Sequence, residues 1–556
     1  MKKQLLTIAA LGLFATGIQA QTATFKYFSY EGNDSRFDKA IDNASEYFNP
    51  VMAGFYPDPS FCRKGDTYYL VNSSFSFFPG VPIFESKDLV NWKQIGNVLD
   101  RESQLPLGNQ RVSGGIFAPA ISYNEKNKTF YMITTNVGKG NFYVKTQDPA
   151  KGWSEPIYLP QVGGIDPSFC FDKKTGKAWI VNNDAPSTKP NYEGERSIWL
   201  HEFDVKNDCV VGEAVEIVRG GTHVVKNPIW IEGPHLFKEG KYFYLMCAEG
   251  GTCDFHSEVI LRATDPKGPW EEYTEGNPIL TQRVGLDPNR PDIVTSAGHA
   301  DIVKDPKGNW WACFLACRPY QDDFYNTGRD TYLLPVTWKN GWPTILEKNT
   351  PVPTIVKKEG LQYEAGLNNT GNFKYVDRFD KGTLDMRWMY LRNPDMSAYS
   401  LGSNGLSIKA SSANIHEVKP LTAVWRRQQH NTFTAETEVN FTPADEKGMA
   451  GFALLQNEQY NFTFGKTKIG GRNAIVLTRA EKSNVVVGSK FLCDKCANAP
   501  VKLRIHGDGR YYDFSYSIDG KNWETVAQGV DAVNLSTHQS GGFIGACIGL
   551  YATSNK

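Results

Sequence analysis

The sequence predicts an all-β protein in which a five-bladed β-propeller is followed by a β-sandwich. Two observations lead to this prediction. One phrase recurs five times between residues 48 and 350, and the C-terminal third alternates between polar and apolar residues in short segments separated by Gly, Asn and Asp. Repeats of this length are typical of propeller blades, and alternation of period two is typical of sheets with one buried face.

Each copy of the phrase combines a turn, a few β-formers, a polar turn and an aromatic-rich strand. The five copies begin YPDPSFC, IFAPAIS, GIDPSFC, WIEGPHLF and SAGHADIV, and they lie about 50 to 70 residues apart, one per four-stranded blade. A second phrase ending in Trp follows three of them, at Trp92, Trp153 and Trp270. This regularity predicts one structural unit repeated five times.

The copies align a short set of residues whose side chains we expect to meet. In chain order the aligned residues are Asp58, Ala118, Asp166, Glu232 and His299. The innermost strands of a propeller converge on its axis, so equivalent side chains gather around one point. Gathering three carboxylic acids and a histidine at one place costs folding free energy, because like charges repel. Such clusters are therefore typical of catalytic sites. This cluster is therefore the predicted site.

The remaining chain divides by composition. Residues 1–20 carry two lysines, an apolar run and small residues, which indicate a signal peptide and an exported, most simply periplasmic, protein. Residues 21–47 are polar and are expected to lead into the first blade. The propeller is expected at 48–350, a Pro- and Gly-containing linker at 351–372, and the sandwich at 373–556.

Composition excludes several classes of protein. The 60 basic and 60 acidic residues balance, so the chain lacks the basic footprint of a nucleic-acid binder. No later apolar run reaches the length of a membrane span. The lone pair Cys493 and Cys496 indicates a surface bridge or two ordinary thiols rather than a zinc or redox site. Oligomeric state is left open.

The aligned acids suit glycoside hydrolysis. In that reaction one carboxylic acid protonates the leaving oxygen while a carboxylate activates water or attacks directly. A third acid nearby can raise the pKa of the proton donor. A single Asp before Pro is more often a turn former, but acids at several equivalent repeat positions favour a catalytic interpretation.

The chain resembles glycoside hydrolase family 43 over residues 48–346. The motifs that carry the resemblance include YPDPSFC, SGGIFAPAIS, GGIDPSFCFD, IEGPHLFK, SAGHADIV and GRDTYLLPV, in this order. The C-terminal segment resembles the β-sandwich of the family's β-xylosidase-like members, which implies a concanavalin-like sandwich. The resemblance implies a propeller enzyme that inverts the anomeric carbon, with Asp58 as general base, Glu232 as general acid and Asp166 as the residue that tunes the acid.

The resemblance also implies five residues of the sugar pocket. Arg329 is expected to bind substrate hydroxyls, and His299 to contact water or a calcium ion on the propeller axis. Phe75 and Phe117 are expected to be aromatic walls, and Phe543 to reach the pocket from the sandwich. No metal is required by the reaction, so any calcium near His299 is expected to be structural or to tune the base.

The preferred hypothesis is an exo-acting hydrolase that releases terminal α-L-arabinofuranosyl residues from plant cell-wall polysaccharide or oligosaccharide side chains. Phe117, where many relatives carry Trp, and a short segment between Arg318 and Arg329 favour it slightly over a β-D-xylosidase or a bifunctional enzyme. An endo-arabinanase and a non-catalytic glycan-binding protein are weaker alternatives. Glu249 and His256 lie in an EGGT…H stretch to which no role is assigned.

Overall fold

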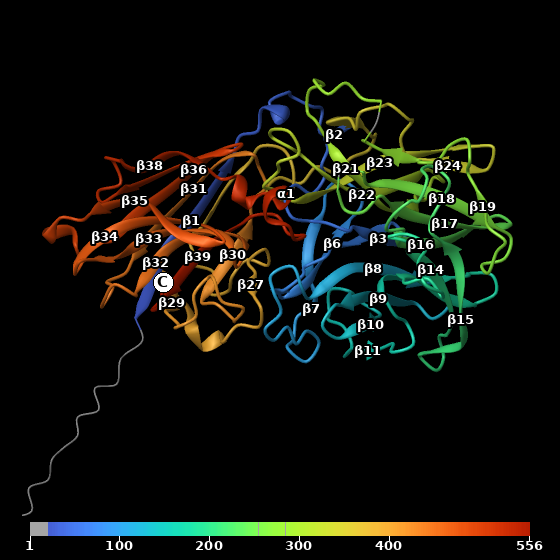
Figure 1. Ribbon diagram of the computed structural model, residues 1–556, viewed down its shortest axis with the longest axis horizontal. Helices are drawn as coiled ribbons and strands as arrows, with labels where there is room; N and C mark the ends of the chain where they lie inside the picture. Colours follow the sequence, from blue (N-terminus) through green and yellow to red (C-terminus); the bar gives the residue numbers. More distant parts are fainter. Residues whose placement is uncertain (1–20, 254, 284) are drawn as a thin grey trace, which may run out of the picture.

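The computed structural model describes residues 21–253, 255–283 and 285–556 (Figure 1). The expected signal peptide lies outside these residues. Strands dominate the described chain, and its helical structure is confined to one short helix and four 3₁₀ turns. These are α1 (Thr537–Ser540), η1 (Ser35–Phe37), η2 (Met396–Ala398), η3 (Asp494–Cys496) and η4 (Val533–Leu535). The all-β prediction is confirmed.

Five antiparallel sheets form the propeller. Blade one contains β3 (Ser60–Lys64), β4 (Thr67–Val71), β6 (Gly80–Ser86) and β7 (Lys93–Leu99). Blade two contains β8 (Ile116–Asn124), β9 (Thr129–Asn136), β10 (Gly140–Thr146) and β11 (Ile157–Tyr158). Blade three contains β12 (Ile165–Phe171), β13 (Ala178–Asp184), β14 (Ser197–Asp204) and β15 (Cys209–Arg219).

Blade four contains β16 (Glu232–Glu239), β17 (Tyr242–Glu249), β18 (Ser257–Ala263) and β19 (Glu271–Glu272), with β20 (Leu280–Thr281) also paired to β18. Blade five contains β21 (Thr295–Lys304), β22 (Trp310–Cys317), β23 (Arg329–Lys339) and β24 (Trp342–Thr344). The innermost strands β3, β8, β12, β16 and β21 contact one another in sequence, and β21 returns to β3. The ring is therefore closed, and it leaves only short outer strands exposed.

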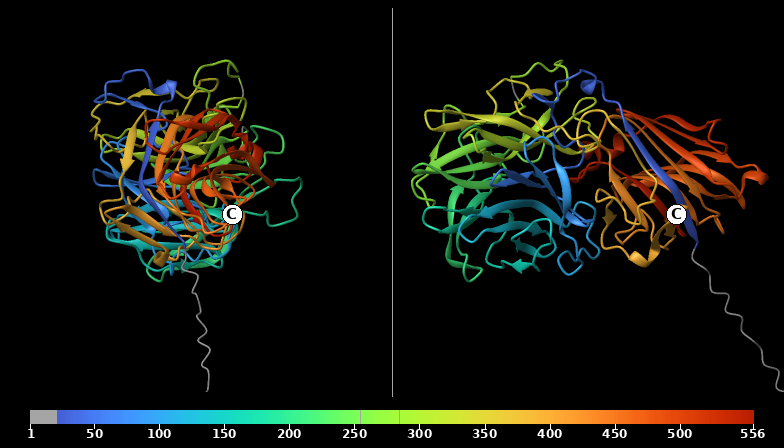
Figure 2. Two further views of the ribbon diagram at one scale, coloured as in Figure 1. Left: turned by 90° about the vertical axis from the view of Figure 1, so that its left-hand side faces the viewer. Right: turned by 180° about the vertical axis from the view of Figure 1, so that it is seen from behind.

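Two sheets form the sandwich beside the propeller (Figure 2). One sheet contains β28 (Tyr399–Gly402), β29 (Gly405–Lys409), β1 (Thr22–Gly32), β31 (Thr432–Asn440), β36 (Val501–Asp508), β37 (Tyr511–Ser517) and β38 (Glu524–Asp531), with β26 (Lys374–Asp377) paired to β1. The other contains β30 (Ala423–Arg427), β39 (Cys547–Thr553), β32 (Met449–Asn457), β33 (Tyr460–Ile469), β34 (Arg472–Glu481) and β35 (Ser483–Phe491).

The first strand of the described chain belongs to the sandwich. β1 pairs with β29, β26 and β31, so it lies inside a sheet built otherwise from the C-terminal third of the chain (Figure 1, dark blue among orange and red). Its inward residues Ala23, Phe25 and Phe28 are fully buried. The sequence suggests that residues 21–47 only lead into the first blade. In the structure, residues 22–32 form a strand of the sandwich, and the chain then continues to the first blade of the propeller.

One hydrophobic cluster spans both domains. Phe55, Phe75 and Phe77 of the propeller pack with Trp425 and Ile544 of the sandwich. The two-stranded sheet of β5 (Phe77–Phe78) and β27 (Tyr390–Leu391) crosses the same boundary, and β2 (Glu46–Phe48) pairs with β25 (Ile355–Lys357) next to the linker. A shared core and a shared sheet make the two domains one packed unit, because neither buries these side chains alone.

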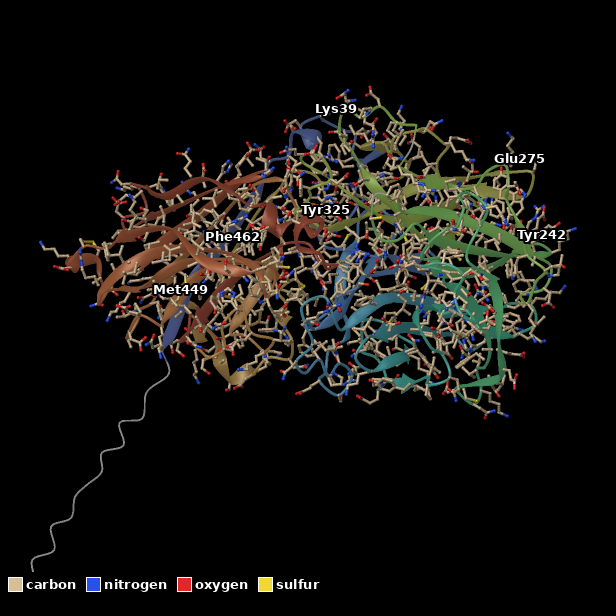
Figure 3. The ribbon with its side chains drawn as sticks, in the orientation of Figure 1. Lys39, Tyr242, Glu275, Tyr325, Met449 and Phe462 are labelled. Carbon is tan, nitrogen blue, oxygen red and sulfur yellow. A yellow bond between two sulfur atoms is a disulfide. The ribbon has the colours of Figure 1, made fainter. Side chains whose placement is uncertain are left out.

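A fully buried arginine reinforces the boundary. Arg318 pairs with Asp330 at 2.9 Å and with Asp34 at 3.0 Å, and its Nη2 also donates to the backbone oxygen of Gln429 at 2.9 Å. Removing one partner would leave a buried charge uncompensated, which typically costs 3–5 kcal/mol. The segment after Arg318 is thereby held against the sandwich, where Tyr325 lies between the domains (Figure 3).

Two remaining sequence features have simple outcomes. Cys493 and Cys496 form a disulfide, which agrees with the first of the two interpretations given for this motif, a surface bridge. Among the described residues, no helix has both the length and the apolar character that crossing a membrane requires.

Candidate active site

The aligned repeat positions share an unusual backbone conformation. Asp58, Ala118, Asp166 and His299 have φ angles of 50°, 39°, 56° and 52°. This left-handed region is rare for residues other than glycine and is often found at functional sites. The ladders of β8, β12 and β21 are irregular at the same points, as expected for bulges that redirect a side chain. The repeat therefore turns its aligned side chains toward the axis.

The fourth blade departs from this alignment by one residue. There the left-handed position is taken by Gly233, with φ 55°, and Glu232 immediately precedes it. A side chain at Gly233 would place its Cβ 2.8 Å from Nε2 of His299, so only glycine fits. The expected equivalence of Glu232 with Asp58 and Asp166 is therefore corrected. Glu232 reaches the same pocket from the position before the bulge.

Asp58 is held in its ionised form. Arg329 Nη1 donates to its Oδ1 at 2.5 Å, Ser73 Oγ donates to its Oδ2 at 2.5 Å, and His299 Nδ1 lies 3.9 Å from Oδ1. Burial alone would raise the pKa of Asp58, but Arg329, His299 and Ser73 outweigh burial and lower it. Asp58 is thus an acceptor for a proton.

Asp166 and Glu232 have the opposite electrostatic environment. Burial, followed by the charge of Asp58, raises the pKa of Asp166 to about 7, although the Gly233 backbone donates to its Oδ2 at 3.1 Å. Burial, followed by the charges of Asp166 and Asp58, raises the pKa of Glu232 to about 8. Glu232 therefore carries a proton at neutral pH. Carboxyl groups whose pKa values are pushed apart in one pocket are suited to base and acid roles.

The three acids line a cavity of about 400 Å³. All eight residues singled out in the sequence lie on its wall: Asp58, Phe75, Phe117, Asp166, Glu232, His299, Arg329 and Phe543. The wall also contains Ala118, Ile165, Trp230, Gly251 and Thr252. A cavity of this size with a few converging polar groups is typical of a small-molecule site.

Three phenylalanines close one side of the cavity. The ring of Phe117 lies 5.1 Å from that of Phe75 and 5.5 Å from that of Phe543, both edge to face. Phe543 comes from the sandwich and is anchored by its backbone, which accepts from Arg329 Nη2 at 3.2 Å and donates to Ser113 Oγ at 3.0 Å. The pocket is therefore completed by both domains.

Sequence reasoning did not identify several residues of this wall. Trp230 is 40% exposed, and the guanidinium of Arg196 lies 5.3 Å from its ring. Thr252 Oγ1 donates to Glu232 Oε1 at 3.4 Å. Trp230 lies two residues before Glu232, and this proximity in sequence could have predicted its place on the wall. Ser73 lies behind this wall, where it donates to Asp58, and nothing in the sequence distinguishes it from the other serines of the chain.

The side chains around His299 do not form a calcium site of protein oxygens. Asp58, whose Oδ1 lies 3.9 Å from His299 Nδ1, already binds the Arg329 guanidinium, and burial lowers the pKa of His299 to about 4, so its ring is neutral. Calcium prefers six to eight oxygen ligands. Among the described residues, no cluster of three or more His, Cys, Asp or Glu is arranged to hold a metal ion.

Both domains of the chain are similar to known proteins. The sequence model described as glycosyl hydrolases family 43 matches residues 47–343, and that of the β-xylosidase C-terminal concanavalin A-like domain matches residues 376–556. The chain is 38% identical to a xylosidase/arabinosidase of Butyrivibrio fibrisolvens over 523 residues, covering 91% of this chain and 96% of that protein.

A second relative and a solved structure are also similar to this chain over both domains. The chain is 35% identical to the non-reducing end α-L-arabinofuranosidase BoGH43B of Bacteroides ovatus, covering 91% of each protein. The crystal structure of a GH43_12 protein retrieved from capybara gut metagenome has a TM-score of 0.89 and 41% identity, covering 96% of this chain and all of that one. These likenesses extend over both domains.

Proposed function

The chain belongs to glycosyl hydrolase family 43 and is a glycoside hydrolase, and from this premise we propose that it is an exo-acting α-L-arabinofuranosidase of plant cell-wall polysaccharides or their fragments. The observation that carries the proposal is one cavity that holds both Asp58, paired with Arg329, and the buried Glu232; the first arrangement lowers the pKa of Asp58 and burial raises the pKa of Glu232. The sandwich residue Phe543 on that wall supports an exo mode, because it narrows a propeller mouth that would otherwise be open to a chain.

The proposed reaction is a single displacement. The Asp58 carboxylate takes a proton from a water molecule as the water oxygen attacks the anomeric carbon, and the glycosidic bond breaks. Glu232 gives its proton to the departing oxygen, so the products are a free sugar with inverted configuration and an alcohol. Arg329 keeps Asp58 ionised and oriented, and Asp166 keeps Glu232 protonated.

The alternative activity is β-D-xylosidase, alone or together with arabinofuranosidase. A terminal arabinofuranose and a terminal xylose present similar hydroxyl positions, and the Butyrivibrio relative carries both activities in its name. The aryl α-L-arabinofuranoside is expected to have a higher kcat/KM than the aryl β-D-xyloside, because Phe117 supplies a smaller wall than tryptophan would. Steady-state kinetics on the two glycosides checks this order, and a higher kcat/KM on the xyloside would make the xylosidase the main activity.

Replacing Asp166 with Asn is expected to lower activity and to shift the basic limb of the pH profile. The charge of Asp166 raises the pKa of Glu232, so its removal lets Glu232 ionise at lower pH. The basic limb of kcat against pH therefore moves toward acid. An unchanged basic limb in the folded variant would show that Asp166 does not tune the acid.

We propose that hydrolysis requires no metal ion. The reaction needs two carboxyl groups and water, and the Asp58 carboxylate beside His299 is engaged by Arg329. Dialysis against EDTA is expected to leave kcat unchanged. If activity is lost and calcium restores it, His299 belongs to a metal site and this proposal is wrong.

We propose, finally, that the protein is exported and acts in the periplasm, on the strength of residues 1–20. Cell fractionation with N-terminal sequencing of the mature protein checks this proposal. Recovery of an uncleaved chain from the cytoplasm would contradict it.

A further inference from the structure

His256 lies behind the proton donor and is not used by the reaction described above. It precedes β18, is fully buried, and places Nε2 at 3.9 Å from Oε1 of Glu232. Its other ring nitrogen, Nδ1, lies 3.1 Å from the backbone oxygen of Ser296. Nε2 has no hydrogen-bond partner within the part of the chain that the structure describes. A buried polar atom of this kind requires an explanation.

The contact with Ser296 determines which ring nitrogen carries the hydrogen. A backbone oxygen only accepts, so Nδ1 must donate to it, and a neutral ring then leaves Nε2 as a pure acceptor. Burial, followed by repulsion from His299, lowers the pKa of His256 to about 3, so the ring is neutral. The ring also packs closely on the backbone, because a Cβ on Gly298 would lie 2.7 Å from Nδ1. His256 is thus a fixed acceptor.

The charge state of Glu232 determines what this acceptor does. An ionised carboxylate has no hydrogen to offer and would place its lone pairs against that of Nε2. A protonated carboxyl has one O–H, and about 1 Å of side-chain movement closes the gap to hydrogen-bonding distance. A hydrogen bond made only by the protonated form favours that form.

We propose that His256 is a positioning residue for the proton donor, whose Nε2 accepts the O–H of protonated Glu232 until the leaving glycosidic oxygen replaces it. The hydrogen bond orients the acid and opposes its ionisation between turnovers. This inference rests on the proposed function, because it assigns His256 through the role of Glu232.

Other charged groups face the same pair. Asp58 and Asp166 raise the pKa of Glu232, whereas Arg329 from β23 lowers it. His299 from β21 and Arg329 lower the pKa of His256, whereas Asp58 raises it. None of these groups is altered when His256 alone is changed, so a shift caused by a His256 variant reports on the contact with Glu232.

Two substitutions separate the two nitrogens. His256→Asn retains a donor near Nδ1 for Ser296 but removes the acceptor near Glu232. His256→Gln retains an acceptor near Nε2 but gives up the donor to Ser296. If His256 positions the acid, the Asn variant is the defective one and the Gln variant resembles the wild type. If His256 only supports the fold, the order is reversed.

The readouts are the pH profile and the dependence on leaving group. For His256→Asn, we expect the basic limb of kcat to move by about half a pH unit or more toward acid, since one hydrogen bond is lost. We also expect about a 10-fold loss of kcat on the phenyl glycoside and little loss on the 2,4-dinitrophenyl glycoside, whose departure needs no acid. His256→Gln should keep the wild-type limb and leaving-group dependence.

The outcomes distinguish this inference from the proposed function. A wild type that hydrolyses neither the arabinofuranoside nor the xyloside refutes the function. An active wild type whose two variants share its pH profile, or whose Gln variant alone is impaired, refutes only the role of His256. Thermal melts show which variants are folded. If a variant does not fold, ¹⁵N-histidine-labelled wild type decides, because the Nε2 resonance of His256 must change as Glu232 ionises, and a constant resonance overturns the inference.

Discussion

Glu232→Gln and Asp58→Asn are each expected to reduce kcat by about 10³-fold or more while leaving the fold intact. Gln cannot give a proton to the leaving oxygen, and Asn cannot take one from water. Both substitutions preserve size, and the Gln side chain also removes the cost of ionising a buried acid. The measurement is kcat on the aryl glycoside together with a circular dichroism spectrum of each variant.

A matched control lies on the same strand. Glu239→Gln makes the same substitution at the other end of β16, where the carboxylate forms a surface pair with Lys304 at 2.8 Å. It is expected to keep wild-type activity, because surface pairs contribute little. The loss for Glu232→Gln should also shrink on a dinitrophenyl glycoside, whereas the loss for Asp58→Asn should persist. Retention of a tenth of wild-type activity by either variant would remove that residue from its role.

Deleting the sandwich is expected to yield an insoluble or greatly weakened enzyme. Because β1 is part of the sandwich, the fair deletion keeps residues 34–371 and removes both ends of the chain. It exposes the propeller side of the shared hydrophobic cluster, breaks the Arg318 contact with Gln429, and removes Phe543 from the pocket wall. Expression, solubility and kcat/KM on small aryl glycosides measure the result.

A point substitution measures the contribution of Phe543 to the pocket wall without removing the sandwich. Phe543→Ala should lower kcat/KM while the full chain remains folded. Its matched control is Phe491→Ala, which removes a ring that is 47% exposed on β35, a strand on the side of the sandwich away from the propeller (Figure 1). A soluble, fully active propeller would make the sandwich an accessory, and equal kinetics for the two Phe variants would remove Phe543 from the site.

Much of the architecture follows from local sequence pattern. The five copies of one phrase predict five blades, because each copy codes a turn and a strand whose aromatic residues suit a packed sheet. The phrase also brings Asp58, Asp166 and His299 together, since equivalent positions of a closed ring face its axis. Period-two alternation predicts the sandwich in the same way, because each strand has one buried face. These are properties of short segments, and the order of residues determines them.

Other features depend on contacts between distant segments. The alignment placed Glu232 level with Asp58, but packing against His299 demands a glycine at that position, and the acid lies one residue earlier. The short stretch 22–32 looks like a leader, and only pairing with strands more than 340 residues away in sequence makes it a sandwich strand.

The electrostatics of the site also depend on contacts between segments that are distant in the sequence. The sequence by itself determined that this protein is a propeller and sandwich with three acids at one mouth. Only the tertiary structure decided their charge states, because the pairing of Arg329 with Asp58 and the burial of Glu232 beside Asp166 and Asp58 bring together different blades of the propeller. Burial and Coulomb interaction depend on distance in space, and no local pattern encodes that distance.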